Sequence, residues 1–497
     1  MTTTVAPGSH DTVTDSPIRP AVLFRLATAG GRADRIRTAL TAASSALAAV
    51  TLLAAATVAA IPEGDALYRI EMIARGEQRA AVIAALLLVA VPILVLAGQS
   101  IRFGSPGRDR RFALLRLVGA TPGQAVRLAV WETVLAATLG SAVGLGLYLT
   151  WRAVLDRPAQ DGSRALPTDV LPSMVMMGSV LLLVPMLTAI GAMILLRPVI
   201  VTPLGVVRRV RDRRPAGWPG LLIIGGVLAP VVVDPFGGWL LGNADEAEPG
   251  PGLAALTLAA VVLLATAGVL IGSGWIAYTA GELLQRFGRR PALLLAGRRL
   301  TADPWSGSRL HAALFAALIV GAGASSVRAY VVAMQDAGDR MADLSGRPPI
   351  PGGEYHLNPI TLIDLAVAVV IGLAAAGILV ALAEGITTRR RVYAAQVAAG
   401  VPRRVLGEAI AWQALGPAVP AVVISLTLGW SIVRSLGSTV TVGEVDEPGL
   451  RVTVPIEVPV GDLLLLGGGA VAALALVAGI GVLLLRMNTD LEEIRVG

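Results

Sequence analysis

Residues 79–97 read RAAVIAALLLVAVPILVLA, and this stretch decides the fold. It carries no charge after its first arginine, and its length matches the ~20 apolar residues that an α-helix needs to cross a membrane. Nine further stretches of this kind predict further spans, and they are separated by polar or Pro/Gly-rich breaks. These stretches are 39–61, 126–150, 173–196, 221–235, 253–280, 311–327, 360–382, 406–433 and 462–485. Segment 221–235 is short and contains Pro230, so a kinked or re-entrant segment stays open there.

The composition agrees with a polytopic all-α membrane protein. The 497 residues are 55% hydrophobic and only 15% charged, which excludes the soluble classes. The chain has no cysteine, which excludes disulfide frameworks, thiolate metal sites and cysteine nucleophiles. It also has no lysine, so it lacks the phosphate-binding Gly-Lys-Ser/Thr of a Walker A loop. We therefore expect no ordinary ATPase domain in this chain.

The arginines predict the orientation of the spans. Of the 41 arginines, 29 fall in the tails and in alternate loops that become cytoplasmic if the N-terminus lies inside, and ten fall in the opposite loops. The spread over six juxtamembrane segments argues against nucleic-acid binding, which needs a single basic face. Residues 1–20 are polar and lack an apolar core, so we expect a disordered cytoplasmic tail. Both termini are predicted to be cytoplasmic, in a multi-pass protein.

One outer loop has the pattern of a β-hairpin. Apolar and polar residues alternate over residues 439–442 and again over 450–454, with turn-forming residues 444–449 between them. We therefore predict a small external β-hairpin in this loop.

An internal repeat underlies the ten spans. RRFALLRLVGATPGQAVRLAVWE, residues 110–132, aligns with RVYAAQVAAGVPRRVLGEAIAWQ, residues 391–413, at a shift of 281. Each copy has an arginine cluster, a short segment too charged to span, a glycine-centred turn and then a long span. The predicted organisation is a four-span unit over 21–218, two linking spans over 219–280 and a second four-span unit over 281–497. An even number of intervening spans makes the units parallel repeats.

The segment 110–132 resembles the hallmark segment of FtsX-like permeases, the membrane subunits of ABC transporters of the MacB and BceB type. PLGVVR at 203–208 is similar to the tail typical of that domain, and the second copy matches the pattern less closely. The resemblance implies that the two short segments are cytoplasmic coupling helices that dock on a separate ABC ATPase. The docking residues it implies are Arg110, Arg111, Phe112, Leu115, Arg116, Gly119, Thr121, Arg390, Arg391, Gly400, Pro402 and Arg403.

The resemblance also implies partners and location. It implies two ATPase copies for each permease, with ATP and Mg²⁺ held by the ATPase and no cofactor bound by this chain. It places the protein in the plasma membrane of a bacterium. The short outer loops leave no room for a large external domain, so export or membrane extraction of an amphipathic substrate, such as a lipid, peptide or antibiotic, is the most economical function.

Two other transport mechanisms stay open. A proton-coupled efflux carrier would use intramembrane carboxylates, and Glu132, Asp364 and Glu408 are the candidates. A mechanotransmitting permease would instead regulate a partner without moving solute. An enzyme is not expected, because the sequence has neither His-Glu-x-x-His nor Gly-x-Ser-x-Gly and assembles no catalytic set.

Overall fold

The computed structural model confirms an all-α membrane protein. It describes residues 32–62, 68, 70–74, 76, 79–100, 121–157, 164, 166–201, 217–218, 220–221, 224, 251–304, 311–346, 353–434, 438–443 and 451–487. Within these ranges nine helices are long and apolar enough to cross a membrane. Each overlaps one of the predicted spans over most of its length. The remaining predicted span, 221–235, lies almost entirely outside the described residues, as does the predicted N-terminal tail.

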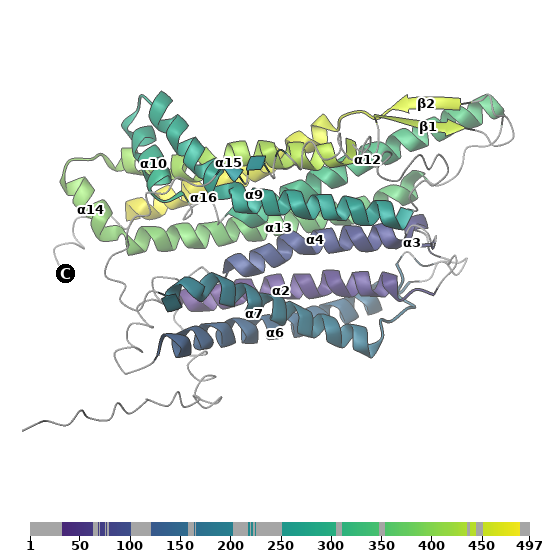
Figure 1. Cartoon of the computed structure of the whole chain (residues 1–497), viewed down its shortest axis with the longest axis horizontal. Helices are drawn as coiled ribbons and strands as arrows, with labels where there is room; N and C mark the ends of the chain where they lie inside the picture. The colour runs from purple at the N-terminus through teal and green to yellow at the C-terminus, as the bar shows by residue number, and fades with distance from the viewer. Residues whose placement is uncertain are drawn as a thin grey trace, which may run out of the picture.

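The long helices lie roughly side by side and the short elements gather at the two ends of the bundle (Figure 1). The helices are α2 (Arg32–Ala59), α3 (Glu71–Ala74), α4 (Arg79–Ser100), α6 (Pro122–Leu155), α7 (Met174–Val201), α9 (Pro251–Phe287), α10 (Pro291–Ala302), α12 (Ala312–Ser345), α13 (Gly353–Thr388), α14 (Arg390–Ala398), α15 (Arg403–Arg434) and α16 (Val460–Met487). The end that carries α10 and α14 is called the coupling end here, and the opposite end, which carries α3 and the β-strands, is called the outer end.

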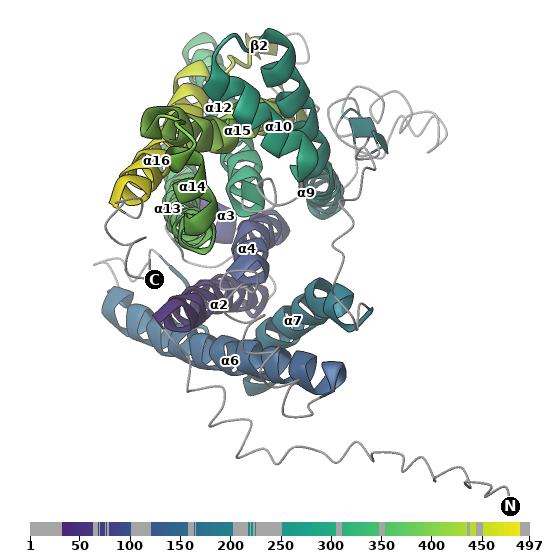
Figure 2. The same cartoon turned by 90° about the vertical axis from the view of Figure 1, so that its left-hand side faces the viewer.

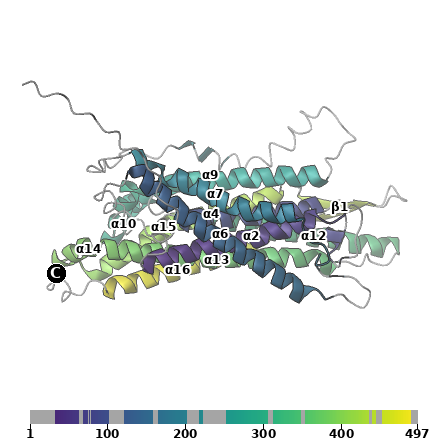
Figure 3. The same cartoon turned by 90° about the horizontal axis from the view of Figure 1, so that it is seen from below.

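The two halves repeat the same neighbour pattern. In the first half α2 packs against α4 and α6, and α6 packs against α7; in the second, α12 packs against α13 and α15, and α15 packs against α16. Figure 2 shows the two groups seen from the coupling end, with α4 between them. Seen from below, α6 runs obliquely across α2 and α4 (Figure 3). The predicted repeat is therefore visible in three dimensions.

The core lies where the halves meet. One apolar cluster joins Leu53 of α2 and Ile93 of α4 to Ala317 of α12 and Val370 of α13, and all four are buried. A second cluster adds α9, α15 and α16. Helix α4 contacts α9, α12 and α13, so it is the element of the first half that the second half holds most closely.

Small residues bring α2 and α6 together. A Cβ placed on Gly140 would collide with the backbone of Ala42, and one on Gly144 would lie 2.5 Å from the carbonyl oxygen of Ala46. Only glycine fits at such positions, because the two backbones are in direct contact. Gly140 and Gly144 therefore allow α2 and α6 to pack closely.

The predicted β-hairpin is confirmed and has an unpredicted support. Strands β1 (Thr439–Gly443) and β2 (Arg451–Pro455) pair antiparallel, with Val440 opposite Val454. They pack on α12, which continues to Ser345, so the predicted span 311–327 ends too early and residues 328–345 are helical. The reason is an apolar stripe at four-residue spacing, Ala333, Ala337 and Met341, which is buried under the hairpin.

A second helix replaces a predicted loop. Residues 281–310 were expected to connect two spans, yet α9 continues to Phe287 and α10 follows it. Pro291 starts α10, where a missing N–H costs nothing, and Ala292, Ala296 and Leu300 are buried on one face at four-residue spacing. Helix α10 packs on α9 and α15 at the coupling end.

Candidate functional site

The candidate site is built around α14, the short helix of the second repeat segment. Its end has the geometry of a Schellman motif: Gly400 has φ 90°, the Gly400 N–H donates to Val397 O, and the Val401 N–H donates to Gln396 O at 3.0 Å. A residue with a Cβ is strained at this φ. The predicted glycine-centred turn is thus confirmed, and it directs the chain from α14 into α15.

One face of α14 is anchored to the bundle. Tyr393 is 5% exposed and lies in an apolar cluster with Ile386 of α13, Leu406 of α15 and Leu485 of α16. The guanidinium of Arg299, on α10, lies 5.2 Å from the centre of the Tyr393 ring, an attractive cation–π arrangement. It also donates to the Tyr393 hydroxyl at 3.3 Å and to the Gln396 side-chain oxygen at 3.4 Å.

The opposite face of α14 is open. Arg390 and Arg391 are exposed at its first turn, Val392 is 55% exposed, and Ala395 and Ala399 are exposed further along. Residues three or four positions apart lie on one side of a helix, so Val392, Ala395 and Ala399 make a small apolar stripe beside two arginines. Pro402 and Arg403 follow at the start of α15.

The first repeat segment is described only at its end. Thr121 is the N-cap of α6: its hydroxyl accepts from the Gln124 N–H at 3.3 Å, and the Gln124 side chain accepts from the Thr121 N–H at 3.0 Å. The other predicted docking residues of this copy lie outside the described residues. They are Arg110, Arg111, Phe112, Leu115, Arg116 and Gly119.

Glu132 forms a buried ion pair at the coupling end. Its carboxylate lies 2.7 Å from the guanidinium of Arg37 on α2, and the two side chains are only 8% and 5% exposed. One turn along α2, Thr41 Oγ1 lies 2.6 Å from Ser100 Oγ at the end of α4. A buried polar network therefore joins α2, α4 and α6.

The other two candidate carboxylates are also paired with arginine. At the outer end, Arg328 of α12 contacts Asp364 of α13 and lies 3.4 Å from Asp462 of α16, which links three helices. At the coupling end, Glu408 pairs with Arg404 one turn away on α15 at 2.9 Å. Sequence reasoning found the carboxylates but missed Arg37 and Arg328, because each lies on another helix and is distant from its partner in the chain.

Comparison with known protein families identifies the repeat. Residues 80–202 and 365–490 each match the FtsX-like permease C-terminal family, and together the matches cover half of the chain. The chain belongs to the FtsX-like permease family. No curated protein and no solved structure matches it. Each matched region lies within one predicted four-span unit and contains one copy of the repeat segment.

Membership settles the general type of protein. FtsX-like permeases are membrane subunits of ABC transporters, so this chain is a multi-pass transporter permease that works with an ATPase. Permeases of this family are generally not catalytic themselves. The function of α14 and of the buried pairs must therefore be sought in transmission of motion and in contact with a partner.

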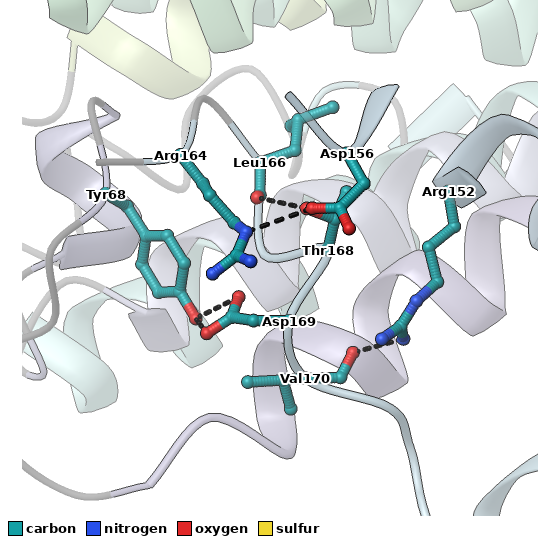
Figure 4. Close-up of polar contacts among 8 residues, drawn as sticks. All are labelled: Tyr68, Arg152, Asp156, Arg164, Leu166, Thr168, Asp169 and Val170. Atoms are coloured by element: carbon teal, nitrogen blue, oxygen red, sulfur yellow. Dashed lines mark hydrogen bonds and ion pairs between the residues drawn. The ribbon is translucent and has the colours of Figure 1, made fainter. Parts of the chain in front are cut away.

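At its outer end this FtsX-like permease has a polar clamp between two loops (Figure 4). The Tyr68 hydroxyl donates to the Asp169 carboxylate at 3.0 Å. Partial burial, as the larger cause, and this hydrogen bond, as the smaller one, raise the pKa of Tyr68 to about 12. Asp156 accepts from Thr168 at 2.8 Å and from Arg164 at 3.0 Å, and these bonds lower the pKa of Asp156. The clamp ties the loops after α2 and α6 together.

Proposed function

We propose that this chain is the permease subunit of an ABC exporter, which docks two copies of a separate ATPase and moves an amphipathic substrate outward. The docking sites are the segment ending at Thr121 and helix α14 with the turn at Gly400. The coupling end is then cytoplasmic, as the arginine distribution predicts. The observation that carries the proposal is α14, which is anchored by one face and open on the other.

The two faces of α14 suit transmission of force. A docking helix must be firmly attached to the spans, and Tyr393 provides that attachment through α10, α13, α15 and α16. It must also present a surface to a partner, and the open face offers Val392, Ala395 and Ala399 next to Arg390 and Arg391. Such a surface fits a shallow apolar groove with an acidic rim on the ATPase.

The paired carboxylates favour this reading over a proton-coupled carrier. A proton carrier needs a carboxylate that changes its protonation state during the cycle. Glu132, Asp364 and Glu408 each form an ion pair with an arginine in the structure. The pairs of Glu132 and Asp364 each join two helices, so these two carboxylates are suited to holding helices together.

The substrate class follows from where a substrate can bind. The described outer elements beyond the bundle are small, namely α3, the β-hairpin and the last turns of α12 that the hairpin covers. Much of the surface of α6, α7 and α16 is apolar, with Leu139, Leu182 and Leu465 at least 65% exposed. A molecule reaching such a permease would come through the lipid, which selects a lipid, a peptide or an antibiotic with apolar parts.

The test is to isolate the tagged chain from native membranes in mild detergent and to quantify the proteins that remain bound. We expect two ATPase copies per permease. The double variant Val392→Asp/Ala395→Asp, on the open face of α14, should lose one copy while its amount in the membrane stays unchanged. Arg340→Ala, an exposed arginine at the outer end that pairs with Asp336, is the matched control and should retain both copies.

A wild-type chain recovered alone would contradict the proposal, provided that other membrane complexes survive the same detergent. Retention of both copies by the α14 variant would contradict the docking surface alone. A complex that binds the ATPase but exports no amphipathic compound would favour a mechanotransmitting permease.

A further inference from the structure

We propose that Arg37 and Glu132 are positioning residues that fasten α2 to α6, so that motion of the first docking segment is delivered to α2. The inference rests on the proposed function and names the element that receives the motion. The ion pair lies within the helix bundle and not on the surface proposed to contact the ATPase.

The location of the pair supports this role. The first docking segment lies between the end of α4 and the start of α6, so it can move both helices. Arg37 ties α2 to α6 through Glu132, ten residues after α6 begins at Pro122. Thr41 ties the same turn of α2 to Ser100, the last residue of α4. Helix α2 is thus bonded to both helices that flank the docking segment.

Packing alone already joins α2 to α6. The direct backbone contacts at Gly140 and Gly144 pack α6 closely against Ala42 and Ala46 of α2. Buried ion pairs usually add little net stability, because the cost of removing both charges from water offsets their attraction. The pair is therefore poorly explained as a stabilising device. The pair instead fixes the position of α2 along α6. A guanidinium and a carboxylate hydrogen-bond in one geometry, whereas two apolar surfaces can slide past each other.

The second copy supports a specific role in the first half. At the shift of 281 the position of Glu132 is occupied by Gln413, which is uncharged. The preceding position is the same in both copies: Trp131 and Trp412 are both tryptophan and are both about half exposed. The charge is therefore a feature of one half and not of the repeat.

The experiment uses the complex of permease and ATPase in lipid vesicles. The chain has no cysteine, so spin labels can be placed at single introduced cysteines. One label pair joins the outer end of α2 to α13, at Ala59→Cys and Leu365→Cys; the other joins the outer end of α6 to α13, at Leu155→Cys and Leu365→Cys. All three positions are exposed. Inter-label distances are measured without nucleotide and with ATP and vanadate, together with the rate of ATP hydrolysis.

We expect both distances to change with nucleotide in the wild-type complex. In Glu132→Gln the α2–α13 change should disappear while the α6–α13 change remains, and stimulation of ATP hydrolysis by the permease should fall about tenfold, the size of a typical coupling between sites. The exchange Arg37→Glu/Glu132→Arg should restore the α2–α13 change. Glu408→Gln, which alters an exposed pair, is the matched control and should leave both changes intact.

The outcomes separate the two proposals. A wild-type chain that binds no ATPase overturns the proposed function and this inference with it. A wild-type complex in which α2 still follows nucleotide in Glu132→Gln overturns only the inference. Loss of both distance changes in that variant, without recovery in the exchanged pair, shows a merely structural role and also overturns it.

Discussion

The two halves of this permease share one order of helices. Each half has ion pairs that join its own helices, but these pairs lie at opposite ends of the bundle. In the first half the buried pair of Arg37 and Glu132 joins α2 to α6 at the coupling end. In the second half Arg328 joins α12 to α13 and α16 at the outer end, through Asp364 and Asp462. Packing differs as well, because α13 packs closely on α16 whereas α4 makes few contacts with α7.

The different positions of the ion pairs indicate that the two halves share a fold without sharing a mechanism. The second docking helix, α14, is contacted by Arg299 of α10, and α10 packs on α9, which contacts α4 of the first half. In the first half, α6, which follows the docking segment in the chain, is bonded to α2 through Glu132 and Arg37. Motion at the two sites should therefore reach the bundle by different routes, and the following experiments separate them.

The largest expected effect comes from breaking the buried pair of the first half. Glu132→Leu leaves Arg37 buried without its carboxylate, and removing one member of such a pair typically costs about 3–5 kcal/mol. Gln413→Leu, at the matching position of the second half, should cost far less, since no buried charge loses its partner there. The measurement is thermal unfolding of the purified permease in detergent.

A double variant checks the cause. Arg37→Leu/Glu132→Leu removes both charges and should recover most of the unfolding temperature lost in Glu132→Leu. If the double variant is no more stable than the single one, the loss comes from packing of the carboxylate and not from an unpaired charge.

The next test compares the glycine contacts between helices in the two halves, Gly140 of α6 against α2 and Gly429 of α15 against α12. Gly140→Val places side-chain atoms against the α2 backbone, and Gly429→Val does the same against α12, where a Cβ would lie 2.5 Å from Ile319 O. Both should cost about 1–3 kcal/mol by overpacking. Gly146→Val is the control, because nothing lies within 4 Å of its Cβ position. An unfolding temperature for Gly146→Val as low as the others would indicate a general effect of valine.

Much of this architecture could be predicted from the sequence, because the membrane imposes a strong pattern. The nine described spans, the hairpin and the turn at Gly400 follow from hydropathy, alternation and a glycine at a helix end. Helix α10 and the outer end of α12 were missed, since their amphipathic stripes are short and were assigned to loops by charge.

The candidate site was predictable only in part. The docking segments appeared as a repeat, and Glu132 stood out as a carboxylate within a span. Its partner Arg37 is 95 positions earlier and could have been taken for an ordinary juxtamembrane arginine. The role of Tyr393 was also hidden, because a tyrosine in a basic segment gives no sign of which face is buried. Such pairings depend on the packing of helices, which the hydropathy pattern does not encode.

A smaller effect is expected at the anchor of the second docking helix. Arg299→Ala removes a cation–π contact and two hydrogen bonds to α14, and at a partly exposed site this should cost about 0.5–1 kcal/mol. Arg298→Ala, at the neighbouring exposed position, should cost nothing measurable. ATP hydrolysis by the complex is the more sensitive measurement, and it should fall for Arg299→Ala alone. Equal effects of the two variants would show that only the charge of α10 matters.

The smallest effect concerns the polar clamp at the outer end. At the shift of 281 the second half has Pro349 in place of Tyr68 and Leu450 in place of Asp169. Folding raises the pKa of Tyr68 from 10.0 to about 12, so its contribution to stability is fully present below pH 10 and is lost as the pH rises through 12. Burial is the larger cause and the bond to Asp169 the smaller, so Asp169→Asn should lower the pKa only part of the way toward 10.0. The ultraviolet absorbance of tyrosinate, measured against Tyr68→Phe as the blank, follows this titration. A Tyr68 pKa unchanged in Asp169→Asn would assign the whole shift to burial and leave the two loops without their polar link.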